Sequence, residues 1–260
     1  MADITVRFMS KCLIRPVSFK VVIPNDVPEQ FFNENSCWQR PMKTLFLLHG
    51  YTGDADNWVP SMLHIKYNFA IVIPNGENSF WLDGISTGHK FQTFLGEELV
   101  NYVRKTLGLA QKPEDTYIMG LSMGGFGALH TALAYPEVFG KAACLSSALI
   151  VHEVAGMKEG EGNPTANYEY YRECFGEPSK LLESDNNPET LVKKLKASGK
   201  KIPEILMACG TEDFLLENNR QMHAFLEQEN VPHTYIESAG AHTMEFWHEY
   251  AEKFIPVMFG

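Results

Sequence analysis

The stretch "YIMGLSMGGFGALH" (residues 117–130) crowds four glycines around one serine, where an apolar strand-like run meets an apolar helix-like run. Glycine weakens both helices and strands, so the cluster needs a reason. Within it, Gly120-Leu121-Ser122-Met123-Gly124 matches G-x-S-x-G, a turn so sharp that the serine is strained and flanking side chains would collide with the strand or the helix. This context favours Ser122 as an exposed nucleophile over an incidental serine in a glycine-rich turn.

Short apolar runs alternate with helical patterns along the rest of the chain. Such an alternation is typical of a mostly parallel sheet with helices on both faces. The predicted strands are residues 4–9, 17–23, 43–50, 68–76, 115–120, 141–147, 204–210 and 233–238, and the predicted helices are about 56–66, 91–108, 123–135, 215–229 and 244–258. We therefore expect one α/β domain over residues 1–260, built on a twisted sheet of about eight strands.

Residues 148–203 break this alternation. They contain Gly, Pro, Asn and three tyrosines, with weaker helical patterns near 166–175 and 188–198. Loops that follow parallel strands lie at one end of the sheet, where ligands bind. We expect this segment to be a cap-like insertion that covers that end of the sheet.

Two loops that follow late strands carry the partners that a serine nucleophile needs, a base and an orienting carboxylate. "MACGTEDFLLE" places Asp213 after one strand, and "ESAGAHTMEFW" places His242 after the final strand. The order Ser, Asp, His along the chain is the one found with this kind of turn. His242 is therefore the predicted base and Asp213 the predicted carboxylate.

Other acids and histidines fit these roles less well. Glu212, beside Asp213, and Asp185 stay open as alternative carboxylates. The remaining candidate histidines fall inside predicted helices or outside a loop that follows a strand: His130, His152, His223, His233 and His248.

A tetrahedral oxyanion needs two hydrogen-bond donors beside the serine. The N–H of Met123 lies at the start of the helix that follows Ser122, at the positive end of its dipole. In "LLHGYTGDADNW" the loop after a strand offers a second N–H, from Tyr51 or, as second choice, from Thr52. We expect His49 to brace this loop rather than to react.

Composition excludes several classes of protein. The chain has 260 residues, 45% of them hydrophobic, and a net charge of −10, which disfavours nucleic-acid binding. No apolar run approaches the ~20 residues of a membrane span, and the N-terminus lacks the pattern of a signal peptide, so we expect a cytoplasmic protein. The five cysteines are widely spaced without a CxxC pair, and we expect no disulfide framework, metal or cofactor. Homo-oligomerisation is left open.

Several segments resemble the putative-esterase (esterase D-like) family of α/β-hydrolases, and within it the tributyrin esterase and feruloyl or acetyl-xylan esterase branch. The resemblance runs from about residue 43 to the C-terminus and is carried by "LFLLHGYTGDADNW", "VIPNGENSFWLDG", "YIMGLSMGGFGALHTALAYPEVFGKAACLSSAL" and "ACGTEDFLLENNRQMHAFLEQENVPHTYIESAGAHTMEFW". It implies an α/β-hydrolase fold, Ser122, Asp213 and His242 as catalytic residues, and an oxyanion hole of Tyr51 and Met123. It also implies that Trp81 lines the substrate pocket, although this residue is equally compatible with core packing.

The leading hypothesis is a serine carboxylesterase for short acyl esters, acetyl to butyryl, whose substrate is a small molecule. The resemblance adds acetylated sugars and hydroxycinnamoyl esters as natural substrates. The main alternative is a thioesterase similar to S-formylglutathione hydrolases. An alternative from another class, a non-catalytic binding protein on a hydrolase scaffold, is disfavoured because such proteins usually lose a member of the triad, and all three are present here.

Overall fold

Consecutive residues of the central strands contribute to two different cores. In β3 (Lys43–Leu48), Leu45 and Leu47 belong to one core, while Phe46 and Leu48 belong to the other. This period of two follows from the pleat of a strand, because neighbouring side chains point to opposite faces of the sheet. Both faces are therefore covered, as the continuous apolar runs predict.

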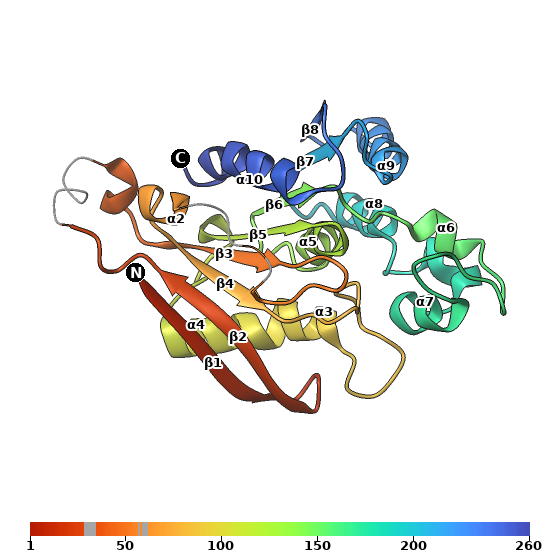
Figure 1. Ribbon diagram of the computed structural model, residues 1–260, viewed down its shortest axis with the longest axis horizontal. Coiled ribbons are helices and arrows are strands. Elements are labelled where there is room, and N and C mark those ends of the chain that lie inside the picture. Colours follow the sequence, from red (N-terminus) through yellow and green to blue (C-terminus); the bar gives the residue numbers. More distant parts are fainter. Residues whose placement is uncertain (29–34, 57, 59–61) are drawn as a thin grey trace.

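The computed structural model describes residues 1–28, 35–56, 58 and 62–260, and its eight strands form one sheet in the order β1-β2-β4-β3-β5-β6-β7-β8 (Figure 1). β1 pairs antiparallel with β2 and β2 with β4, and every other neighbouring pair is parallel. The other strands are β1 Ala2–Ser10, β2 Arg15–Ile23, β4 Phe69–Pro74, β5 Thr116–Leu121, β6 Lys141–Leu145, β7 Glu204–Gly210 and β8 His233–Ser238. The predicted α/β-hydrolase fold is confirmed.

The helices form a layer on each face. Side chains of α4, α5, α8 and α9 belong to one core, and those of α10, with α2 beside them, belong to the other. Their bounds are α2 Leu63–Lys66, α3 Phe91–Thr93, α4 Val100–Leu107, α5 Met123–Ala134, α6 Val151–Ala155, α7 Tyr168–Phe175, α8 Pro188–Ser198, α9 Leu216–Gln228 and α10 Met244–Phe259. The N-terminal part of the helix predicted at 56–66 includes residues outside the described ranges. In the described part of the chain, no helix is both long and apolar enough for a membrane span.

The helix predicted at 91–108 contains a π-helical segment, Phe94–Leu99, between α3 and α4. Gly96 lies in this segment against the ring of Tyr135, where a β-carbon would come within 2.3 Å of a ring carbon. Helical periodicity alone does not reveal a local change in winding of this kind. Gly108 closes the helix in a left-handed conformation, with φ of 69°, as predicted.

Residues 148–203 divide into two parts. α8 packs on α5 beside the sheet and leads into β7, so it is the crossover helix between β6 and β7. α6 and α7 lie farther out, at the end of the sheet toward which β3 and β4 point (Figure 1). Only the first part of the expected insertion therefore lies where a substrate would bind, while α8 belongs to the layer of helices.

Candidate active site

Ser122 lies at the tip of the turn between β5 and α5 with φ of 54° and ψ of −120°, a conformation rare for any residue other than glycine. The residues two positions before and two positions after it must be glycine for steric reasons. A β-carbon on Gly120 would lie 2.1 Å from the carbonyl oxygen of Gly124, and one on Gly124 would lie 2.5 Å from the carbonyl oxygens of Leu48 and His49. The turn therefore has the sharpness that the sequence predicts, and the Ser122 hydroxyl faces the cavity described below.

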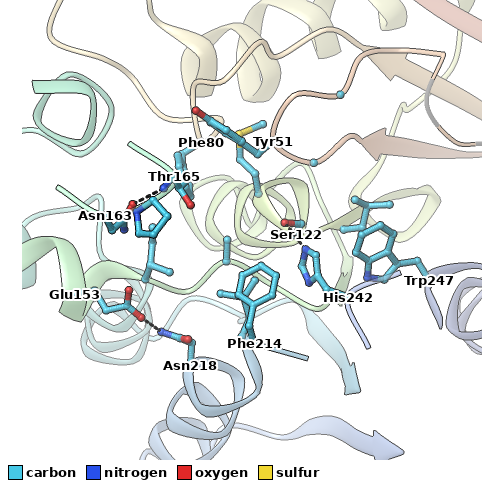
Figure 2. A pocket seen from close by; sticks show the side chains of 18 of the residues that line it. Tyr51, Phe80, Ser122, Glu153, Asn163, Thr165, Phe214, Asn218, His242 and Trp247 are labelled. Carbon is cyan, nitrogen blue, oxygen red and sulfur yellow. Dashed lines mark hydrogen bonds between the residues drawn. The ribbon is translucent and has the colours of Figure 1, made fainter. Parts of the chain in front are cut away.

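Ser122, His242 and Asp213 form a hydrogen-bonded chain. Nε2 of His242 lies 3.0 Å from Ser122 Oγ (Figure 2). Nδ1 of the same ring lies 2.9 and 3.0 Å from the two carboxylate oxygens of Asp213. The loop after β7 brings Asp213, and the loop after β8 brings His242, to the tip of the turn after β5. With Nδ1–H donated to the carboxylate, Nε2 is free to accept the serine proton.

The carboxylate of Asp213 has no exposed side-chain surface. Burial alone would raise its pKa, but hydrogen bonds from His242 and from the N–H of Leu215, at 2.9 Å, outweigh burial and lower the pKa below its usual value. Asp213 is therefore a carboxylate at neutral pH and suits the orientation of a histidine that becomes charged.

The alternative carboxylates make other contacts. Glu212 Oε2 accepts a hydrogen bond from the N–H of Gly240 at 2.8 Å, and so supports the loop that carries His242. Asp185 pairs with Lys194, and its backbone carbonyl accepts a hydrogen bond from His130. Of these three carboxylates, only that of Asp213 hydrogen-bonds to the His242 ring in the described part of the chain.

Tyr51 and Met123 line the same cavity as Ser122. Met123 is the first residue of α5, so its N–H has no acceptor inside the helix. Gly50 lies against the serine, because a β-carbon placed on it would be 3.3 Å from that of Ser122. The N–H of Thr52 donates to Asn78 Oδ1 at 2.8 Å, which leaves Tyr51 as the better choice for the second oxyanion donor.

His49 braces the loop, as the sequence predicts. Its Nδ1–H donates to the carbonyl of Gly50 at 2.8 Å, and its Nε2 accepts from the N–H of Gly76 at 2.9 Å. Burial lowers the pKa of His49, so the ring stays neutral and keeps this pair of roles.

Trp81 does not line the cavity, so the prediction from the resemblance is wrong. Its side chain is fully buried, and its Nε1–H donates to the carbonyl of His49 at 3.3 Å. The ring fills the space left by Gly76 and Gly127, where added β-carbons would lie about 2.5 Å from it. Phe80, one residue earlier, lines the cavity instead.

The cavity has a volume of about 590 Å³ and two chemically different sides. We call Gly50, Tyr51, Ser122 and Met123 the elbow side, and Glu153, Asn163, Thr165 and Asn218 the polar side. Figure 2 shows the Ser122–His242 pair between the polar side and Trp247. Among the described residues, none that lines the cavity is a lysine or arginine.

Known proteins resemble this chain over nearly its whole length. The family model "Putative esterase" matches residues 28–258. The acetyl esterase of Caldicellulosiruptor saccharolyticus is 40% identical over 254 residues, which cover 96% of this chain and 95% of that protein. The chain belongs to the Putative esterase family. It is a serine hydrolase that acts on carboxylic ester bonds.

Solved structures agree with this assignment. The fluorophosphonate-binding serine hydrolase FphF of Staphylococcus aureus is 27% identical with a TM-score of 0.84, and the match covers 100% of this chain and 98% of that one. The S-formylglutathione hydrolase FrmB of the same organism is 26% identical with a TM-score of 0.81, covering 100% and 99%.

Sequence reasoning missed two aromatic residues of the esterase site. Phe214 has 76% of its surface exposed, and its ring centroid lies 4.5 Å from that of His242. The ring of Trp247 is nearly perpendicular to that of His242, with 4.8 Å between centroids. The position of Phe214, directly after Asp213, was the available signal. Trp247 lies within the helix predicted at 244–258, where no motif sets it apart from the other aromatic residues.

Proposed function

We propose that the esterase hydrolyses short acyl esters through an acyl-enzyme on Ser122. Ser122 Oγ attacks the ester carbonyl carbon while its proton moves to Nε2 of His242. The charge that develops on the carbonyl oxygen is stabilised by the N–H groups of Tyr51 and Met123. The bond to the alcohol oxygen then breaks, and the alcohol leaves with the proton from His242.

The second half of the reaction repeats these roles with water. His242 takes a proton from water as the water oxygen adds to the acyl carbon. The second tetrahedral intermediate then releases the carboxylic acid, and Ser122 Oγ recovers the proton from Nε2. The observation that carries this proposal is the 3.0 Å separation of His242 Nε2 and Ser122 Oγ, with Asp213 on the far side of the ring.

The cavity supports a preference for acetyl to butyryl groups together with a polar alcohol. An acetyl group fills little of about 590 Å³, so most of the space is available to the alcohol part. We place the acyl group toward Trp247 and the alcohol toward the polar side, where Asn163, Thr165 and Asn218 offer donors and acceptors. Acetylated sugars and hydroxycinnamoyl esters fit this description.

A thioesterase similar to S-formylglutathione hydrolase is the second candidate, favoured by the likeness to FrmB. A glutathione thioester carries two carboxylates and one ammonium at neutral pH, and so has a net negative charge. The cavity lining offers it Glu153 and, among the described residues, no lysine or arginine. Like charges repel, so the lining supports a neutral alcohol more than a glutathione leaving group.

A fluorophosphonate probe and a substrate series test the proposal. Wild-type protein should be labelled, and Ser122→Ala should escape labelling and lose ~10⁴-fold or more of its kcat/KM on p-nitrophenyl acetate. Across p-nitrophenyl esters, kcat/KM should be highest from acetyl to butyryl and fall steeply by octanoyl. Near-normal turnover by Ser122→Ala would remove the nucleophile assignment, and a preference for decanoyl esters would remove the short-acyl assignment. Comparing S-formylglutathione with acetyl esters separates the two candidates.

A further inference from the structure

The loop that carries Tyr51 is held by a side chain from a distant turn. The N–H of Thr52 donates to Oδ1 of Asn78 at 2.8 Å. Thr52 has φ of 62°, in the left-handed region that a β-branched residue rarely adopts. The amide oxygen of Asn78 therefore fixes an unfavourable backbone conformation at the residue that directly follows Tyr51.

Asn78 is itself held from α7. Its backbone carbonyl oxygen accepts a hydrogen bond from the Tyr170 hydroxyl at 2.6 Å and a weaker one from Cys174 Sγ at 3.5 Å. The Tyr170 ring also meets the ring of Tyr51, with 5.9 Å between centroids. Asn78 thus connects the loop of the oxyanion donor to a helix outside the sheet.

We propose that Asn78 is a positioning residue for the oxyanion hole, acting through Thr52 on the direction of the Tyr51 N–H. This inference rests on the proposed function. The peptide plane between Tyr51 and Thr52 includes the Thr52 N–H, so the hydrogen bond to Asn78 limits rotation at that plane. Without it, the loop relaxes toward a commoner conformation and turns the neighbouring donor away from the oxyanion.

The proposal predicts a specific kinetic signature. The oxyanion exists in the transition state and is absent from the bound ester, so a misplaced donor lowers kcat while KM changes little. Loss of a correctly placed oxyanion donor costs about 10²–10³ in kcat, and a displaced donor should cost less. A ketone that adds to Ser122 to form an oxyanion should lose affinity in parallel.

Asn78→Ala is the test, and Asn75→Ala is its matched control. Asn75 Oδ1 accepts a hydrogen bond from the N–H of Ala55 at 2.7 Å, so the control removes the same kind of contact from the same loop, farther from Tyr51. The measurements are kcat and KM on p-nitrophenyl acetate, the inhibition constant of an alkyl trifluoromethyl ketone, and the melting temperature. Asn78→Ala should lower kcat about 10- to 100-fold and raise the inhibition constant similarly, with KM within about threefold. Asn75→Ala should change kcat by less than about threefold.

Asn78→Asp distinguishes the loss of this hydrogen bond from a loss of folding, since a carboxylate oxygen can accept from the Thr52 N–H at the same place. It should recover most of the kcat lost in Asn78→Ala. Equal kcat losses in Asn75→Ala and Asn78→Ala, a loss carried by KM, or unchanged affinity for the ketone would overturn the proposal. Failure of the proposed function is distinguishable, because wild-type protein would then be inactive on the ester or Ser122→Ala would remain active.

Discussion

The elbow side and the polar side of the cavity differ in what determines their structure. On the elbow side, backbone atoms approach so closely that added β-carbons on Gly120 and Gly124 would overlap neighbouring carbonyl groups. On the polar side, Asn163 accepts hydrogen bonds from the N–H groups of Thr165 and Ala166, within its own loop, and Glu153 is exposed. The first arrangement tolerates few sequences and the second tolerates many. We therefore expect the reaction type to depend on the backbone of the elbow side and the choice of substrate to depend on replaceable side chains of the polar side.

The largest effect should come from the carboxylate behind His242. Asp213→Asn keeps the shape, but it removes the negative charge and introduces an amide NH2 that can donate to Nδ1 and favour the wrong histidine tautomer, so kcat/KM should fall about 10⁴-fold. Glu212→Gln removes only a contact to the N–H of Gly240, which the amide oxygen of glutamine can still accept. Its kcat/KM should stay within about threefold of wild type. If Glu212→Gln were the inactive variant, Glu212 and not Asp213 would be the acid that orients His242.

A smaller effect, on stability, should separate Trp81 from Phe80. Trp81→Ala leaves a void between Gly76 and Gly127 in the core, which should cost about 3–5 kcal/mol and lower the melting temperature by about 10 °C. The ratio of kcat/KM between acetyl and butyryl esters should not change. Phe80 lines the cavity beside Thr165 (Figure 2), on the side assigned to the alcohol, so Phe80→Ala should change the ratio of kcat/KM between two acetyl esters with different alcohols. A changed acetyl-to-butyryl ratio in Trp81→Ala would show that Trp81 contributes to the substrate site.

The elbow, the sheet and the order of Ser122, Asp213 and His242 could all be predicted from the sequence. Glycine spacing reports close backbone contacts directly, and continuous apolar runs report strands buried on both faces. The loops after parallel strands meet at one end of the sheet, so residues 120 positions apart could be assigned to one place. These features are local patterns or follow from topology.

Other features depend on packing that no local pattern records. Phe80 and Trp81 are adjacent aromatic residues, and the space that Trp81 fills in the core lies beside Gly76 and Gly127, which are distant from each other in the sequence. The π-helical segment contains Gly96, which packs against the ring of Tyr135, a distant contact that the helical pattern of the segment does not record. The role of α8 depends on its contact with α5, which its own amphipathic pattern does not specify.

His130 lies in α5 and contacts the segment that follows α7. We expect this residue to make the stability of the fold depend on pH. Nε2–H donates to the carbonyl of Asp185 at 2.7 Å, while the buried Nδ1 has no hydrogen-bond partner in the described part of the chain. Burial lowers the pKa of His130 from 6.5 to about 4. Between these values the unfolded chain binds a proton that the folded protein does not. Stability should therefore fall by up to about 3 kcal/mol as pH drops from 6.5 to 4.

Denaturant unfolding at pH 7, 5.5 and 4.5 measures this dependence. His130→Gln keeps a donor for the Asp185 carbonyl but binds no proton, so its stability should decline less over the same interval. His152, half-buried beside Glu189 near the surface, provides a control in His152→Gln. If the free energy of unfolding fell equally with pH in wild type and His130→Gln, His130 would not be the source of the acid sensitivity.

The smallest effect should appear on the polar side, at Glu153. Its exposed carboxylate accepts a hydrogen bond from Asn218 Nδ2 at 2.8 Å and faces the space assigned to the alcohol. Exposed charges interact weakly in water, so Glu153→Gln should raise kcat/KM by only about threefold for a substrate whose leaving group already carries carboxylates before cleavage. The gain should shrink at high salt, and kcat/KM for p-nitrophenyl acetate should not change.

Glu159→Gln is the matched control, because it makes the same change in net charge on the same segment at a residue that does not line the cavity. Assaying both variants on S-formylglutathione and on an acetyl ester separates a local effect from a general one. A gain confined to Glu153→Gln would show that a replaceable side chain on the polar side helps to select the leaving group while the elbow side keeps the chemistry constant. Equal gains in both variants would assign the effect to the net charge of −10 and remove Glu153 from substrate selection.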